Sequence, residues 1–149
     1  MGYKIENSIT PEEYNELRNS VGWDSKDEKV IQNAIKNSVI VKKVIVNDKV
    51  VAMARTIGDG LYYLIVDVVV NQQYQRKGIG KILIEEIVKE VYNKTKEGQK
   101  ASINLISMQG KEAFYEKCSV AAGSLCLIYT RDRKDYLLQA GTSNSGLKA

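Results

Sequence analysis

The sequence contains no histidine and only two cysteines among its 149 residues. The absence of histidine excludes the Ser-His and Cys-His pairs that activate a nucleophile, and every zinc site that needs an imidazole ligand. Cys118 and Cys126 are too few for a thiolate metal cage and lack the CxxC spacing of redox pairs. We therefore expect no metal site, and we interpret both cysteines as unreactive core thiols.

Long hydrophobic runs are also missing. Uninterrupted hydrophobic runs, such as those around 64–66 and 68–70, are far shorter than the roughly 18 residues that a membrane span requires. The first residues lack the apolar core and the cleavage site of a secretory signal. These absences predict a cytoplasmic protein that does not contact a membrane.

The overall composition is that of an ordinary globular domain, with 44% hydrophobic and 27% charged residues. Lysine and arginine number 22 and aspartate and glutamate 18, which gives a net charge of +4. This mild excess suits a small polyanionic ligand as well as a nucleic acid, so it does not choose between them. The length predicts a single domain over residues 1–140, followed by a flexible tail at 141–149.

Hydrophobic periodicity predicts alternating strands and helices. Thr10, Pro11 and two following acids form a strong helix start, and Asn47-Asp48-Lys49 separates two β-branched runs as a hairpin turn does. The fold class expected is therefore α+β, as a mixed sheet with helices on both faces. The elements expected are strands at 3–5, 39–46, 50–57, 61–70, 101–106, 125–130 and 135–138, and helices from 10 to about 22, at 26–36, from 79 to about 91 and at 111–117.

Asp67 is the only charged residue in the run 61–70, which otherwise consists of Leu, Ile, Val and Tyr. Such a run is typical of a strand that is buried on both faces and lies centrally in its sheet. A carboxylate at that place is energetically expensive unless it is paired or hydrogen-bonded. We expect a partner for Asp67, and a structural partnership is favoured over a catalytic one.

The segment 75–81, Gln-Arg-Lys-Gly-Ile-Gly-Lys, lies between this strand and the start of the long helix. Helix N-termini bind anions and normally carry acidic residues, yet this one carries Arg76, Lys77 and Lys81. The pattern therefore predicts a phosphate site. The glycine spacing matches neither a P-loop nor a dinucleotide-binding turn, because Gly78 and Gly80 are one residue apart.

The pattern Gln75-x-x-Gly78-x-Gly80, between a strand and an amphipathic helix, resembles the acetyl-CoA signature of the GNAT superfamily of N-acetyltransferases. The downstream segment 113–117, Ala-Phe-Tyr-Glu-Lys, is similar to the second conserved segment of that superfamily. The resemblance covers roughly residues 3–118. It implies a three-layer α/β/α fold with a largely antiparallel, six- to seven-stranded mixed sheet, and direct transfer of acetyl from acetyl-CoA to an amine.

In that fold the strands at 61–70 and 101–106 start side by side and then splay, and the pantetheine arm of the co-substrate enters the gap. By this resemblance Tyr115 is the acid that protonates the departing thiolate. The general base stays open between Asp67, Asp59 and a carboxylate acting through water. The residues implied to bind acetyl-CoA are Val68, Val69, Val70, Gln75, Arg76, Lys77, Gly78, Ile79, Gly80 and Lys81.

The expected acceptor is a small-molecule primary amine, and neither a nucleic acid nor a membrane is expected as a partner. Trp23 is equally consistent with a wall of the amine pocket and with a core residue, while Asp59 offers negative charge to a cationic amine. Dimers are common in the superfamily, and nothing in this sequence requires one. The alternative function is a non-catalytic acyl-CoA-binding or sensing module; a nucleic-acid-binding domain ranks third.

The chain departs from the family pattern at several positions. Asn71 stands where proline is frequent, and Gly110 where asparagine is frequent. After Cys118, Ser119 and the following residues replace the usual Gly-Phe pair. We interpret the segment beyond about residue 118 as atypical of the family, through divergence or an altered reading frame.

Overall fold

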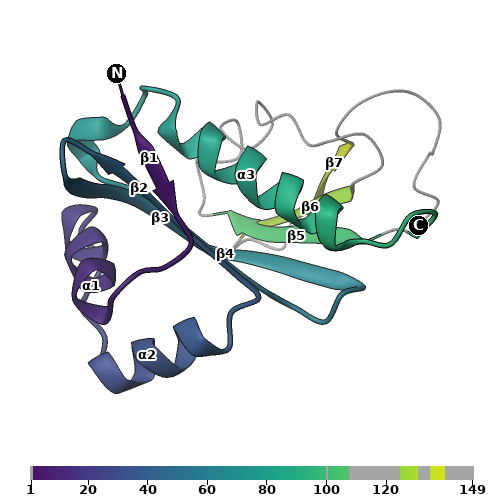
Figure 1. Ribbon diagram of the computed structural model, residues 1–149, viewed down its shortest axis with the longest axis horizontal. Helices are drawn as coiled ribbons and strands as arrows, with labels where there is room; N and C mark the ends of the chain where they lie inside the picture. Colours follow the sequence, from purple (N-terminus) through teal and green to yellow (C-terminus); the bar gives the residue numbers. More distant parts are fainter. Residues whose placement is uncertain (1, 100, 108–124, 131–134, 140–149) are drawn as a thin grey trace.

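A computed structural model describes residues 2–99, 101–107, 125–130 and 135–139 (Figure 1). Its strands form one mixed sheet in which neighbours in the chain are neighbours in space. Pairing is antiparallel from β1 to β4 and between β6 and β7, and parallel across β4, β5 and β6. The strands are β1 (Lys4–Glu6), β2 (Ile40–Val46), β3 (Lys49–Gly58), β4 (Tyr62–Val70), β5 (Ser102–Ser107), β6 (Leu125–Thr130) and β7 (Asp135–Gln139).

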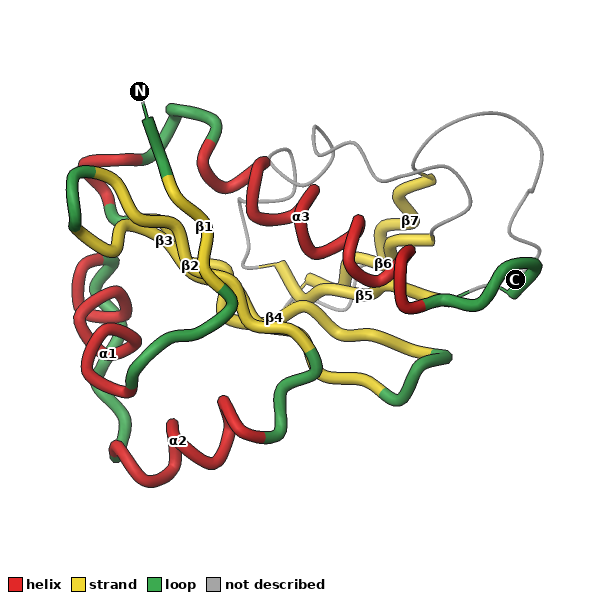
Figure 2. The backbone as a smooth tube through the Cα atoms, in the orientation of Figure 1, coloured by secondary structure: helices red, strands yellow, loops and turns green. Residues whose placement is uncertain are grey.

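Helices cover both faces of the sheet, as Figure 2 shows. The helices α1 (Pro11–Ser20) and α2 (Glu28–Lys36) lie on one face, and α3 (Ile79–Lys94) lies on the other. A short 3-10 helix, η1 (Gln72–Tyr74), connects β4 to the loop before α3. The α+β class and the layering predicted from the sequence are confirmed. The predicted helix at 111–117 and the tail at 141–149 lie outside the described residues.

The starts of α1 and α2 follow from local sequence. The Thr10 hydroxyl accepts from the amide of Glu13 at 3.1 Å, and the Glu13 carboxylate accepts from the amide of Thr10 at 2.9 Å, so the two residues form a capping box. Asp27 caps α2 by accepting from the amides of Lys29 and Val30. This cap explains why α2 begins two residues after the predicted Lys26.

The β2–β3 hairpin has a tighter turn than the sequence predicts. Val46 pairs with Lys49, so only Asn47 and Asp48 lie between the strands. Both have positive φ, at 49° and 59°, and short polar side chains tolerate this conformation better than other non-glycine residues do. The turn therefore fixes the end of the hairpin with two residues rather than three.

Two apolar clusters separate the layers. On the α3 face, helix residues such as Leu83 and Ile87 pack against the sheet and are fully buried. On the opposite face, Tyr14 and Leu17 of α1 pack with Met53 of β3. Strand β3 is buried on both faces at residues 51–54. Strand β4 is buried only at Tyr63, Ile65 and Val69, so its predicted burial on both faces is confirmed only in part.

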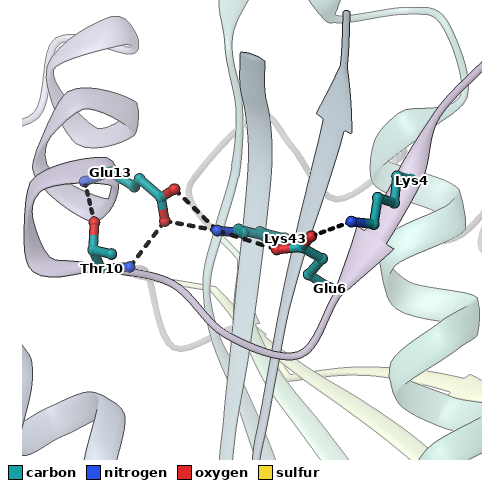
Figure 3. A network of polar contacts seen from close by, with 5 residues as sticks. All are labelled: Lys4, Glu6, Thr10, Glu13 and Lys43. Atoms are coloured by element: carbon teal, nitrogen blue, oxygen red, sulfur yellow. Dashed lines mark hydrogen bonds and ion pairs between the residues drawn. The ribbon is translucent and has the colours of Figure 1, made fainter. Parts of the chain in front are cut away.

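Two adjacent lysines of β2 connect the sheet to both helical layers. Side chains alternate along a strand, so Lys42 points to the α3 face and Lys43 to the α1 face. Lys42 Nζ lies 2.5 Å from the carboxylate of Glu90 in α3. Lys43 Nζ lies 2.9 Å from both carboxylate oxygens of Glu13 in α1 and belongs to the network in Figure 3. Both lysines are buried and paired, and the sequence analysis did not identify them.

Candidate active site

Strand β4 contains a bulge at Asp67. Met53 of β3 pairs with Val69, but Arg55, two residues further, pairs with Val66. Ala54 of β3 therefore lies opposite both Asp67 and Val68. Asp67 adopts a φ of 53°. The sequence predicted the strand but not this irregularity.

The bulge lies where β4 and β5 part. The two strands pair only from Tyr62 with Ser102 to Ile65 with Leu105. Beyond that pair β4 continues to Val70 while β5 pairs with β6 alone. The expected splay of these strands is confirmed, and it leaves the β5-facing edge of β4 without a partner strand in the described part of the chain.

The bulge also changes which backbone groups face this gap. The amide of Ser102 donates to the carbonyl of Leu61. At the start of β4, the backbone N–H and C=O groups of odd-numbered residues therefore point toward β5. The amide of Asn71 donates to Val51 of β3, so after the bulge Val69 faces β3 as well. Val68 and Val70 consequently direct their backbone groups into the gap. Val69, which the sequence analysis grouped with them, instead uses its backbone within the sheet.

The loop before α3 presents backbone amides and cationic side chains next to the end of β4 at Val70. Gly78, with a φ of 81°, caps α3 without any side chain, so among the described residues the first-turn amides have no capping side chain. Arg76 also has a positive φ, and such backbone forms concave anion-binding nests. Gln75 Nε2 donates to the Val70 carbonyl at 2.9 Å, which ties the loop to the end of β4.

The loop cations lie on the surface near this helix start. Arg76, Lys77 and Lys81 are exposed, and the first turn of α3 carries no acid. Lys77 lies over the ring of Tyr74, 5.1 Å from its centre, while Lys81 is 3.7 Å from Glu85 one turn on. The described geometry therefore concentrates positive charge where an anionic group could meet backbone amides.

The carboxylate of Asp67 has hydrogen-bonding and ionic partners, as expected for a charged group in an apolar strand. Its carboxylate accepts a short hydrogen bond from the Tyr14 hydroxyl and another from Arg55 Nε at 2.7 Å. Arg18 lies 3.8 Å from its second oxygen. The expectation that Asp67 is paired and hydrogen-bonded is confirmed. The Asp67 side chain is 18% exposed, so it is largely but not fully buried.

Electrostatics define the protonation states of this cluster. Burial raises the pKa of the Tyr14 hydroxyl above its ordinary value of 10.0, and the charge of Asp67 raises it further. Burial alone would lower the pKa of Arg55, but its bonds to Asp67 and Tyr14 outweigh that effect and leave it raised. At neutral pH Tyr14 is therefore a neutral donor and Arg55 a cation.

The two predicted acceptor residues lie apart from one another. Trp23 is partly buried against the apolar cluster of α1 and α2, and the Arg18 guanidinium lies 5.1 Å from its ring centre. Asp59 accepts from the amides of Leu61 and Tyr62 at 2.9 Å, bonds that lower its pKa. It therefore stabilises the β3–β4 turn, eight residues before the bulge and about 25 Å away along an extended strand.

Tyr115, the predicted acid, lies outside the described residues. Within those residues no helix is long and apolar enough to cross a membrane. The same portion of the chain contains no group of three or more Cys, Asp or Glu side chains placed to hold a metal ion.

Tyr14 and Arg55 are not among the residues that the sequence predicts for the site. A signal for Arg55 was available, since it is the only charged residue in the run 50–57, just as Asp67 is in 61–70. Two lone opposite charges on consecutive apolar strands predict a pair. No local signal identifies Tyr14, which lies 53 residues from Asp67 in the chain.

Comparisons with known proteins agree with this geometry. The family described as "Acetyltransferase (GNAT) domain" matches residues 37–118. An uncharacterized N-acetyltransferase, ycf52, from Pyropia yezoensis is 31% identical over 110 residues. That match covers 70% of this chain and 61% of the relative, so the chain spans less than two thirds of the relative's length. The matched domain ends at Cys118, the residue after which we interpret the sequence as atypical of the family.

Solved structures share the fold. A Staphylococcus aureus protein described as a probable acetyltransferase is 27% identical, with a TM-score of 0.69 over 78% of this chain and 87% of its own. A GNAT family acetyltransferase from Streptococcus pneumoniae, 24% identical, has a TM-score of 0.60 over 76% of this chain and 82% of its own. Together with the domain match, these findings show that the chain belongs to the GNAT superfamily.

Proposed function

We propose that this protein transfers an acetyl group from acetyl-CoA directly to the primary amine of a small molecule. The observation that carries the proposal is the edge of β4 beyond its bulge, which has no partner strand among the described residues, next to the cationic start of α3. An extended pantetheine arm fits an unpaired strand edge, because both have hydrogen-bonding groups along their length. A diphosphate fits helix amides flanked by Arg76 and Lys77.

The proposed division of labour follows from these positions. The backbone of Val68 and Val70 binds the pantetheine arm, and the amides of residues 78–81 bind the diphosphate. The amide of Val68 polarises the thioester carbonyl, a contribution that is typically worth about 3 kcal/mol when such a donor is preorganised. Tyr115 gives its proton to the departing thiolate.

The amine must lose a proton as it attacks the thioester. Asp67, Asp59 and a carboxylate acting through water are the candidate bases that the sequence offers. Asp67 adjoins Val68, whereas Asp59 lies at the far end of β4. Trp23 and Asp59 remain predicted acceptor contacts. The chain has no histidine, which suits direct transfer without a covalent enzyme intermediate.

Calorimetry with coenzyme A tests the binding half of this proposal. We expect the Arg76→Gln/Lys77→Gln double variant to bind about tenfold more weakly than the wild type, which corresponds to about 1.4 kcal/mol. The matched control is Lys89→Gln, an exposed lysine of α3 about 15 Å along the helix from its start, which should bind normally. Absence of binding by the wild-type protein at modest ionic strength would refute the proposal.

Thiol release with a panel of amines tests the transfer half. Tyr115→Phe should lower kcat about 100-fold while coenzyme A still binds, because a general acid acts in the chemical step. Tyr92→Phe, a change at an exposed tyrosine of α3, is the matched control. Binding of acetyl-CoA without thiol release with any amine would instead indicate the non-catalytic acyl-CoA-binding module.

A further inference from the structure

The bulge in β4 is held from outside the strand. Asp67 has left-handed backbone geometry, with a φ of 53°, in the middle of a strand. Aspartate tolerates this conformation, but only glycine adopts it freely. The carboxylate is bonded to Tyr14 of α1 and to Arg55 of β3, so two other elements meet at the one residue whose backbone departs from the strand.

The position of Val68 depends on this departure. The odd-numbered residues of β4 face β5 before the bulge, whereas Val68 and Val70 face the gap after it. If Asp67 returned to ordinary strand geometry, the backbone groups of each following residue in β4 would point to the opposite side of the strand. The amide of Val68 would then point toward β3, and the gap would lose this donor.

We propose that Tyr14 and Arg55 are positioning residues that clamp the Asp67 carboxylate, hold the bulge, and thereby aim the amide of Val68 into the gap. This inference rests on the proposed function, in which that amide polarises the thioester carbonyl. It assigns Asp67 to the positioning of the donor and not to proton abstraction.

The surroundings of the carboxylate support that assignment. A general base needs an oxygen within reach of the amine or of a bridging water. One oxygen of Asp67 accepts from both Tyr14 and Arg55, and the other faces Arg18. The side chain of Asp67 is 18% exposed, so most of the carboxylate faces these three partners and not solvent. These contacts with Tyr14, Arg55 and Arg18 engage the carboxylate in holding the backbone of the bulge.

Hydrogen exchange of the free protein tests the clamp without any substrate. We expect Tyr14→Phe and Arg55→Lys to speed amide exchange at Val66 and Val69 about tenfold, because these residues pair with β3 on either side of the bulge and each variant loses a hydrogen bond to the Asp67 carboxylate. Tyr92→Phe is the matched control and should leave exchange at both residues unchanged. Equal exchange in all four proteins would overturn the clamp.

Three substitutions of Asp67 separate its backbone geometry from its carboxylate. Asp67→Asn tolerates the left-handed geometry and keeps an acceptor for Tyr14, so kcat should fall about tenfold. Asp67→Gly permits the geometry but removes the clamp, and its loss should be intermediate. Asp67→Ala lacks both and should lose about 100-fold, as for a missing oxyanion donor. Affinity for coenzyme A, measured by calorimetry, should stay within about twofold of wild type in Asp67→Asn, which also reports that the variant folds.

Two further readouts separate positioning from base catalysis. With acetyl-CoA labelled at the carbonyl carbon, infrared spectra should show a smaller shift of the thioester stretch in Tyr14→Phe and Asp67→Asn than in the wild type. The pH profile of kcat should keep its shape in Asp67→Asn. Loss of the acidic limb of that profile, with an unchanged infrared shift, would make Asp67 the base and overturn the inference.

Failure of the inference and failure of the proposed function give different results. A wild-type protein that neither binds coenzyme A nor releases thiol refutes the function, while hydrogen exchange still decides whether the clamp exists. A wild-type enzyme that is active and equals its Tyr14→Phe, Arg55→Lys and Asp67→Asn variants in kcat refutes only the inference.

Discussion

At the scale of single residues, the raised pKa of Tyr14 makes the stability of the protein depend on alkaline pH. The folded state holds the tyrosine proton more tightly than the unfolded state, in which the pKa is near its ordinary value of 10.0. The resulting stability is complete below pH 10 and is lost as the pH rises through the folded-state pKa.

This pH dependence can be measured by urea unfolding at pH values from 8 to 11. The wild type should lose free energy of unfolding more steeply above pH 10 than Tyr14→Phe does, because the variant has no proton to release at this site. Lysines also titrate in this range, so the comparison is between the two slopes. Parallel curves would contradict a raised pKa at Tyr14.

Gly78 offers a second test at this scale. Its φ of 81° is unfavourable for any residue with a Cβ, although the space around it is open. Gly78→Ala should therefore lower the free energy of unfolding by about 1–2 kcal/mol through backbone conformation alone. Gly2→Ala, also in open space and without a positive φ, should change nothing. Chemical denaturation of both variants makes the comparison.

At the scale of elements, the contact between β2 and α1 depends on the ion pair of Lys43 with Glu13. The lysine side chain is 8% exposed and the glutamate 26%, so the pair is only partly screened by solvent. Lys43→Met leaves a carboxylate without its cation. We expect a cost of about 1–2 kcal/mol, below the 3–5 typical of a fully buried pair.

A double-mutant cycle with Glu13→Gln isolates this interaction. The double variant should be less destabilised than the sum of the two single variants, by about 1 kcal/mol, because each single change already removes the pair. The control is Lys4→Met, which removes an exposed partner of Glu6 in the same network and should have no measurable effect (Figure 3). Additive effects at Lys43 and Glu13 would show that the pair contributes nothing.

At the scale of the whole molecule, both helical layers share one sheet and should unfold together. Leu17→Ala on the α1 face and Ile87→Ala on the α3 face each remove a fully packed side chain and should each cost about 2–5 kcal/mol. Trp23, the only tryptophan, reports the α1 side by fluorescence, whereas circular dichroism reports every helix. The two signals should give the same midpoint in both variants. An Ile87→Ala protein whose fluorescence midpoint stays at the wild-type value would contradict a single transition.

The parts of the fold that sequence could predict are those determined by neighbours in the chain. The helix start at Thr10 and the hairpin around Asn47 need only local chemistry, and the need of Asp67 for a partner follows from its apolar surroundings. The bulge and the Tyr14 contact depend on how β3, β4 and α1 meet. The hydrophobic periodicity of the sequence does not predict how these three elements meet. The bulge and the Tyr14 contact could therefore be identified only from the structure.

The paired lysines of β2 have a consequence for how the strand finds its partners. Both faces of β2 carry aliphatic residues and one lysine. If β2 shifted by one residue in the sheet, each of its faces would still present aliphatic side chains and one lysine to the helices. Polarity alone therefore barely distinguishes the correct alignment from its neighbour. The two-residue turn at Asn47 and Asp48 supplies the missing reference point. Lengthening that turn would cost specificity of alignment before it cost hydrophobic burial.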